Sequence, residues 1–130
     1  MQTFAKLRVV MSFVLAPIVA ALAINSPFLI EGQSPRIFVT DALINAAIMF
    51  LGAVFIGLPI FLVASAKGWL RLIHAVLAGF STGALFSLLL GGGLRYALVF
   101  GFSGAIAGAI FWFMALFRNP LYPRAKREAK

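Results

Sequence analysis

The sequence predicts an all-α integral membrane protein with four transmembrane helices. Three observations support this fold class: 63% of the 130 residues are hydrophobic, only 11% are charged, and the charged residues leave four long apolar segments uninterrupted. These segments cover residues 9–30, 42–66, 72–90 and 96–117. As helices rising about 1.5 Å per residue, they match a hydrocarbon core about 30 Å thick. Their continuous apolar character excludes the alternating pattern of a transmembrane β-strand.

The first segment also has the features of a secretory signal peptide. Lys6 and Arg8 precede the apolar stretch, and residues 21–23, Ala-Leu-Ala, resemble a cleavage site. Apolar residues resume at Phe28, so we expect the segment to remain as a membrane helix. The alternative is that residues 1–23 are cleaved off as a signal peptide.

Proline and glycine interrupt the first two segments near their middles. Pro17 lies in the first segment, and Gly57 and Pro59 lie in the second. Proline lacks a backbone N–H, and its ring pushes on the preceding turn. We therefore expect a kink in each helix. The freed carbonyls either find partners in neighbouring helices, hydroxyls or water, or line a path for a solute.

The third and fourth segments carry glycines at helical spacing. These are Gly79, Gly83, Gly101, Gly104 and Gly108. Lipid tails are as apolar as leucine, so membrane helices associate through close backbone contact and polar bonds, and small residues four apart allow that contact. The short connection at residues 91–93 predicts an antiparallel pair whose glycine faces meet. A seam between separate chains is the alternative.

The basic residues predict how the chain is oriented in the membrane. With four spans, one side holds Lys6, Arg8, Lys67, Arg71, Arg118, Arg124, Lys126, Arg127 and Lys130, and the other side holds only Arg36 and Arg95. The positive-inside rule then places both termini in the cytoplasm, with the four helices forming two consecutive hairpins in a bacterial inner membrane. We expect one transmembrane domain over residues 1–117 and a basic cytoplasmic tail over residues 118–130.

Polar residues gather at the predicted outer face. They are Glu31, Arg36, Asp41, Asn45 and Arg95. Thr40 or Asp41 is placed to cap the second helix, and Asn45, one turn further in, needs a partner across a helix contact. Pairing of Asp41 with Arg95 would fix the register of the helices. Exposed ion pairs contribute only about 0–1 kcal/mol, so this cluster favours a structural role over substrate binding.

At the predicted inner face, Arg71 and His74 lie one turn apart. A single histidine without a second ligand nearby does not make a two-ligand site, so we expect neither a metal nor a cofactor. The basic tail carries Arg118, Arg124, Lys126, Arg127 and Lys130. Beside a negative inner leaflet, such residues favour binding to anionic lipid headgroups over binding to nucleic acid.

No catalytic constellation is recognisable, so we expect a protein that is not an enzyme. The spans contain no carboxylate, which argues against proton-coupled transport. Our leading hypothesis is a small inner-membrane protein that acts through helix–helix contacts with a membrane partner or with itself, as an accessory, assembly or immunity-type subunit. The alternative is a homo-oligomeric pore or small-solute transporter, including a holin-like variant, lined by Pro17, Pro59, Asn45 and hydroxyl groups.

Overall fold

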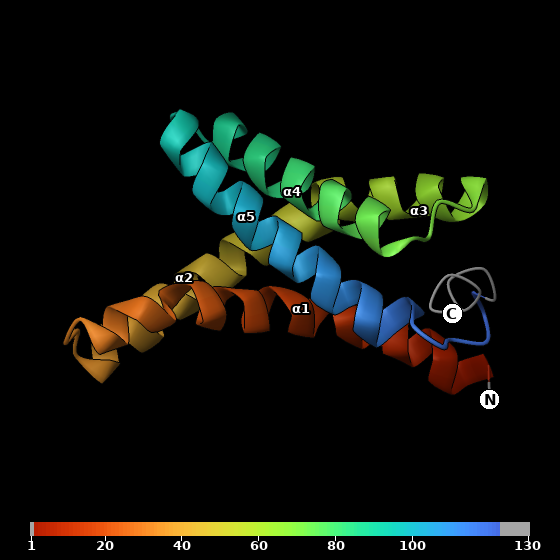
Figure 1. Cartoon of the computed structure of the whole chain (residues 1–130), viewed down its shortest axis with the longest axis horizontal. Coiled ribbons are helices and arrows are strands. Elements are labelled where there is room, and N and C mark those ends of the chain that lie inside the picture. Colours follow the sequence, from red (N-terminus) through yellow and green to blue (C-terminus); the bar gives the residue numbers. More distant parts are fainter. Residues whose placement is uncertain (1, 123–130) are drawn as a thin grey trace.

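The computed structural model describes residues 2–122, apart from the side chains of residues 28 and 29, and over this range all regular structure is helical (Figure 1). The elements are α1 (Gln2–Ile30), α2 (Pro35–Gly52), η1 (Ala53–Gly57), α3 (Leu58–Lys67), α4 (Leu72–Leu89), α5 (Leu94–Phe111) and η2 (Trp112–Leu116). The two η elements are π-helical.

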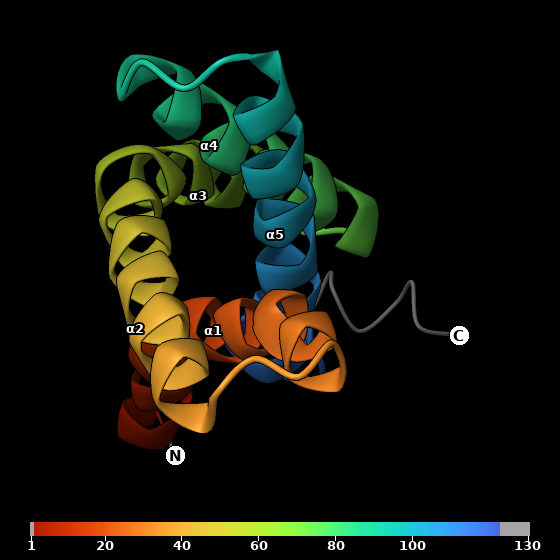
Figure 2. The same ribbon diagram turned by 90° about the vertical axis from the view of Figure 1, so that its left-hand side faces the viewer.

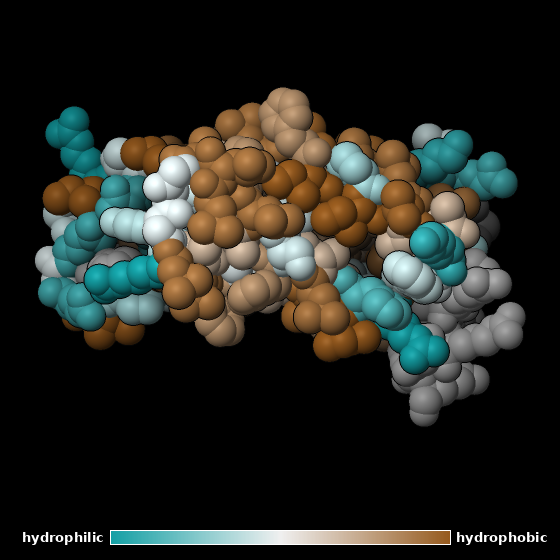
Figure 3. Space-filling model, turned by 90° about the horizontal axis from the view of Figure 1, so that it is seen from above, coloured by the Kyte–Doolittle hydropathy of each residue, from teal (hydrophilic) through white to brown (hydrophobic). Residues whose placement is uncertain are grey.

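Four helical stretches are long and apolar enough to cross a membrane, as the sequence predicts. They are Gln2–Pro27, Pro35–Lys67, Leu72–Leu89 and Leu94–Leu116. Hydrophobic side chains cover most of the middle of the molecule, and hydrophilic ones gather toward its two ends (Figure 3). These features indicate a multi-pass membrane protein.

The second span begins at Pro35, about two turns before its predicted start at residue 42. The Ser34 side chain accepts a bond from the backbone N–H of Ile37 at 3.4 Å, and Pro35 occupies the first turn, where its missing N–H has no intrahelical partner to lose. The prediction that Thr40 or Asp41 caps this helix is therefore wrong. Both lie inside α2, and the Thr40 hydroxyl donates to the carbonyl of Arg36 at 2.9 Å.

The same span is irregular where glycine and proline interrupt it. The backbone N–H of Leu58 bonds to the carbonyl of Ala53, five residues back, and Pro59 has no N–H to restore the regular pattern. This π-helical segment, η1, separates α2 from α3. In contrast, α1 continues as a helix through Pro17. Gly68, with a φ of 72°, ends α3 in the left-handed conformation that glycine adopts readily.

The helices pack mainly as α1 against α2 and α4 against α5 (Figures 1 and 2). α1 also contacts α5 and η2, and α4 contacts η1. Most buried apolar residues are alanines, and the large apolar side chains point outward, as expected of a protein whose surroundings are lipid. A small core of larger residues, Leu70, Trp112 and Leu116 with Ala115, lies at the end of the molecule where the chain starts and where η2 finishes.

Candidate functional site

Glycines bring the backbones of α4 and α5 into direct contact. A Cβ atom added to Gly79 would meet the carbonyl of Gly104, whose carbon would be 2.8 Å away, and a Cβ added to Gly104 would meet the carbonyl of Gly79 at the same distance. A Cβ on Gly83 would lie 2.7 Å from the carbonyl carbon of Phe100. Contacts under 3.0 Å do not occur for real Cβ atoms, so these positions accept no side chain unless the helices move apart.

The two remaining glycines lie at the same contact. A Cβ on Gly108 would be 2.9 Å from the carbonyl carbon of Ala75, and one on Gly101 would be 2.8 Å from the ring of Phe80. The structure thus brings all five glycines singled out in the sequence to one interface within the chain. Four of them, Gly79, Gly83, Gly104 and Gly108, also border the cavity described below.

The polar residues of the predicted outer face do not gather into one cluster. Asp41 accepts a hydrogen bond from the amide of Gln33 at 3.1 Å, and within the described residues it forms no ion pair with Arg95. Arg95 is exposed, as are Glu31 and Arg36. The expected pairing is absent from residues 2–122 because α5, which carries Arg95, packs on α4 and α1, whereas Asp41 lies on α2 beside the loop that carries Gln33.

Asn45 finds its partner across the contact between α1 and α2. Its amide donates to the side-chain oxygen of Asn25 at 3.3 Å, and the buried Asn25 in turn donates to the carbonyl of Ala21 at 2.7 Å. The sequence predicts a partner for Asn45 across a helix contact, but it does not identify Asn25 as that partner. The signal was present, since Asn25 is a strong hydrogen-bonding residue inside an apolar segment.

Two polar side chains join the beginning of the chain to the end of its last helix. Arg8 donates to the carbonyls of Met114 at 3.0 Å and Phe117 at 3.2 Å. Carbonyls in the last turn of a helix lack intrahelical donors, and a cation there also interacts favourably with the helix dipole. From the sequence, Arg8 is singled out only for its charge, as part of the signal-peptide pattern and as a marker of orientation.

The second of these side chains is Asn119, which is 1% exposed. Its amide donates to the carbonyls of Ala115 at 2.6 Å and Ala5 at 3.2 Å, and its oxygen accepts from the backbone of Leu121 at 3.1 Å. Asn119 lies in the predicted tail, where only basic residues were singled out. Of these, Arg118 is exposed, with its guanidinium 5.3 Å from the ring centre of Phe117, and Arg124, Lys126, Arg127 and Lys130 lie outside the described residues.

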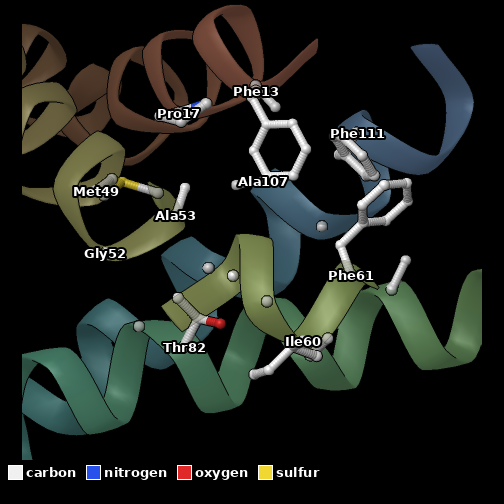
Figure 4. A pocket seen from close by; sticks show the side chains of 18 of the residues that line it. Phe13, Pro17, Met49, Gly52, Ala53, Ile60, Phe61, Thr82, Ala107 and Phe111 are labelled. Carbon is white, nitrogen blue, oxygen red and sulfur yellow. The ribbon is translucent and has the colours of Figure 1, made fainter. Parts of the chain in front are cut away.

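An apolar cavity of about 130 Å³ lies between the two helix pairs (Figure 4). Along α4, its lining follows a single helix face from Arg71 through His74, Ala78 and Thr82 to Phe86. The opposite walls come from α1, α5 and the α2–η1–α3 span, which supply residues such as Phe13, Pro17, Met49, Phe61, Ala107 and Phe111. Phe61 holds α3 over the cavity: its ring centre lies 5.8 Å from that of Phe13 and 5.4 Å from that of Phe111.

Few polar groups enter this cavity. Thr82 is 8% exposed and its hydroxyl has no hydrogen-bond partner among the described residues. The Nδ1 atom of His74 also has none, and the His74 ring stacks on Trp69 with the ring centres 6.1 Å apart. Trp69 and Arg71 are exposed, so the cavity reaches the surface at the connection between α3 and α4.

The chemistry of this cavity is that of a binding site for an apolar group. Engineered protein cavities of about 150 Å³ with apolar walls stay dry and accept a molecule such as benzene. Within residues 2–122, no three His, Asp or Glu residues group together as a metal site would require. Comparison with protein-family models, with curated proteins and with solved structures finds no match to this chain.

Proposed function

We propose that this protein is a non-enzymatic, four-span protein of a bacterial inner membrane that acts through helix–helix contacts with a membrane protein partner or with a second copy of itself. Its helices form two consecutive hairpins, both termini lie in the cytoplasm, and the basic tail lies on anionic lipid headgroups. The contact surface is the outward face of α3.

The observation that carries this proposal is the weak attachment of α3 to the rest of the chain. No residue of η1 or α3 is buried, and α3 contacts other helices through the Phe61 ring, which packs on Phe13 and Phe111. The outward face carries Pro59, Leu62, Val63 and Ala66; Pro59 and Ala66 each lie three or four residues from Leu62 and Val63, so the four form one stripe. A neighbouring helix that packs on this stripe would supply the support that the chain itself does not.

Two further features favour contact over catalysis or transport. The glycines that would otherwise form a seam with another chain are engaged between α4 and α5, so a partner must use a different surface. The cavity walls are apolar and give a polar solute almost no hydrogen-bond partners. The proposed orientation is supported by Arg8 and Asn119, which tie the two ends of the chain together on one side.

Site-specific crosslinking tests this proposal directly, because the chain contains no cysteine. Val63→Cys places a thiol on the α3 stripe, and Phe102→Cys places one on the outer surface of α5 as a matched control, since these side chains are 54% and 64% exposed. Each variant is labelled in native membranes with a thiol-specific photo-crosslinker and irradiated. We expect a discrete dimer or heteromeric product from position 63 at several times the yield from position 102. Equal yields from the two positions would contradict the proposal.

A further inference from the structure

We infer that the cavity binds one hydrocarbon chain of an anionic phospholipid, whose phosphate lies at the opening formed by Trp69, Arg71 and His74. This inference concerns a different surface from the α3 stripe and goes beyond the proposed function.

The shape of the cavity favours a chain over a compact ligand. The lining from Arg71 to Phe86 extends about 22 Å along α4 at about 1.5 Å per residue, so the cavity follows the helix and does not enclose a compact space. The cavity is therefore long and narrow. This length exceeds the depth of one leaflet, because the hydrocarbon core of the whole bilayer is about 30 Å thick.

The order of residues along that lining matches an amphiphile. Arg71 and His74 stand at the open end, and the positions that follow on the same face, Ala75, Ala78 and Gly79, are small and apolar. A phosphate at the opening would accept a hydrogen bond from the Nδ1 atom of His74, which has no partner among the described residues. A hydrocarbon chain would then run inward over the small residues, where there is room for it.

The charge at the opening favours an anionic headgroup. Lys67 lies beside Trp69, with its ammonium 4.8 Å from the ring centre, and Arg71 follows two residues later. The acidic residues within the described range, Glu31 and Asp41, lie at the opposite end of the Pro35–Lys67 span. Trp69 itself is the type of residue that prefers the headgroup level of a membrane.

The hydroxyl of Thr82 has no role in this binding. It lies eleven residues beyond Arg71, about 16 Å along the helix, where a lipid presents only hydrocarbon. Threonine hydroxyls in membrane helices commonly turn back to a carbonyl of their own helix, and this is the partner we assign to it when a chain fills the cavity.

Native mass spectrometry of the full chain in mild detergent tests the inference. The protein is mixed with equal amounts of phosphatidylglycerol, which is anionic, and phosphatidylethanolamine, which is neutral overall. We expect retention of one phosphatidylglycerol molecule in preference to the neutral lipid. Arg71→Gln should lower that preference about fivefold, since each basic residue near an anionic headgroup contributes about 1 kcal/mol and 1.4 kcal/mol is a factor of ten.

A second pair of variants separates the cavity from the surface. Ala78→Leu fills the cavity lining and should reduce retention of both lipids, whereas Ala47→Leu adds the same atoms on the exposed side of α2 and should leave retention unchanged. Circular dichroism verifies that each variant keeps its helices. If Ala78→Leu does not fold, the Arg71→Gln comparison decides. Equal retention of the two lipids by the unchanged protein, or equal retention by the Ala78 and Ala47 variants, would overturn the inference. Failure here leaves the crosslinking test at position 63 unaffected, and the reverse also holds.

Discussion

Replacing Gly104 with alanine should loosen the contact between α4 and α5. The new methyl group would lie 2.8 Å from the carbonyl carbon of Gly79 and nearer still to its oxygen. Ordinary contact begins at 3.4 Å, so the two backbones must separate by at least 3.4 − 2.8 = 0.6 Å. Because the obstructing atoms belong to a helix backbone, no side-chain rotation can relieve the overlap.

The free-energy cost of moving the two helices apart is set by the van der Waals contacts that they lose. A radial gap of about 0.5–1 Å removes a quarter to a half of each van der Waals attraction, and lipid offers no hydrophobic gain that compensates. Overpacking of this kind usually destabilises by about 1–3 kcal/mol. The better helix propensity of alanine returns up to about 1 kcal/mol. We therefore expect the free energy of unfolding to fall by up to about 2 kcal/mol.

Gly57→Ala is the matched control for this substitution. Gly57 is also helical, but a Cβ there would lie 3.8 Å from its nearest neighbours, Ala53 and Thr82, which is ordinary contact. We expect its stability to stay the same or rise slightly. Reversible unfolding with SDS in mixed micelles, followed by tryptophan fluorescence, measures both variants. If Gly104→Ala is as stable as Gly57→Ala, the backbone contact between α4 and α5 is not as close as the structure has it.

Three further substitutions test the hydrogen bonds between distant parts of the chain, each by the same SDS titration. Asn119→Ala leaves two buried carbonyls without their donor and should destabilise by about 2–3 kcal/mol; a loss below about 0.5 kcal/mol would mean that water replaces the bonds freely. Trp112→Phe removes the 2.7 Å bond from the indole to the carbonyl of Leu70 and should reduce stability by about 1 kcal/mol, so an unchanged midpoint would show that this bond does not hold the connection between α3 and α4. Asn45→Leu breaks a longer bond, 3.3 Å, and should destabilise by only about 0.6 kcal/mol; a loss above about 2 kcal/mol would point to a stronger network than the one described.

The number of spans is predictable from the sequence, but their starting points are not. Four apolar runs without a charge require four helices long enough to cross a bilayer. Residues 2–8 and 35–41, which contain charged residues among apolar ones, are also helical, and apolar runs without a charge end before them. The missed signal was local: Ser34 followed by Pro35 is a typical helix start, and it outweighs the charged residues Arg36 and Asp41 that come after it.

The glycine contact and the cavity differ in how far the sequence determines them. Four-residue spacing and a short connection were enough to predict that the glycine faces of α4 and α5 meet. The cavity depends on where four spans leave space between them, and its lining combines residues as distant as Ser12 and Leu116. Arg8 and Asn119 show the same limit, since their partners lie about a hundred residues away and a single sequence carries no sign of those pairings.

The strong bonds of the structure lie away from α3. The long-range hydrogen bonds of Arg8, Asn119 and Trp112 lie at one end of the molecule, and the bond between Asn25 and Asn45 joins α1 and α2 toward the other. Glycine contacts fix α4 against α5 in between. The segment from η1 through α3 has neither kind of support and follows a π-helical turn that proline prevents from closing regularly. The proposed contact on the α3 stripe therefore falls on the part of the bundle that the chain itself holds least.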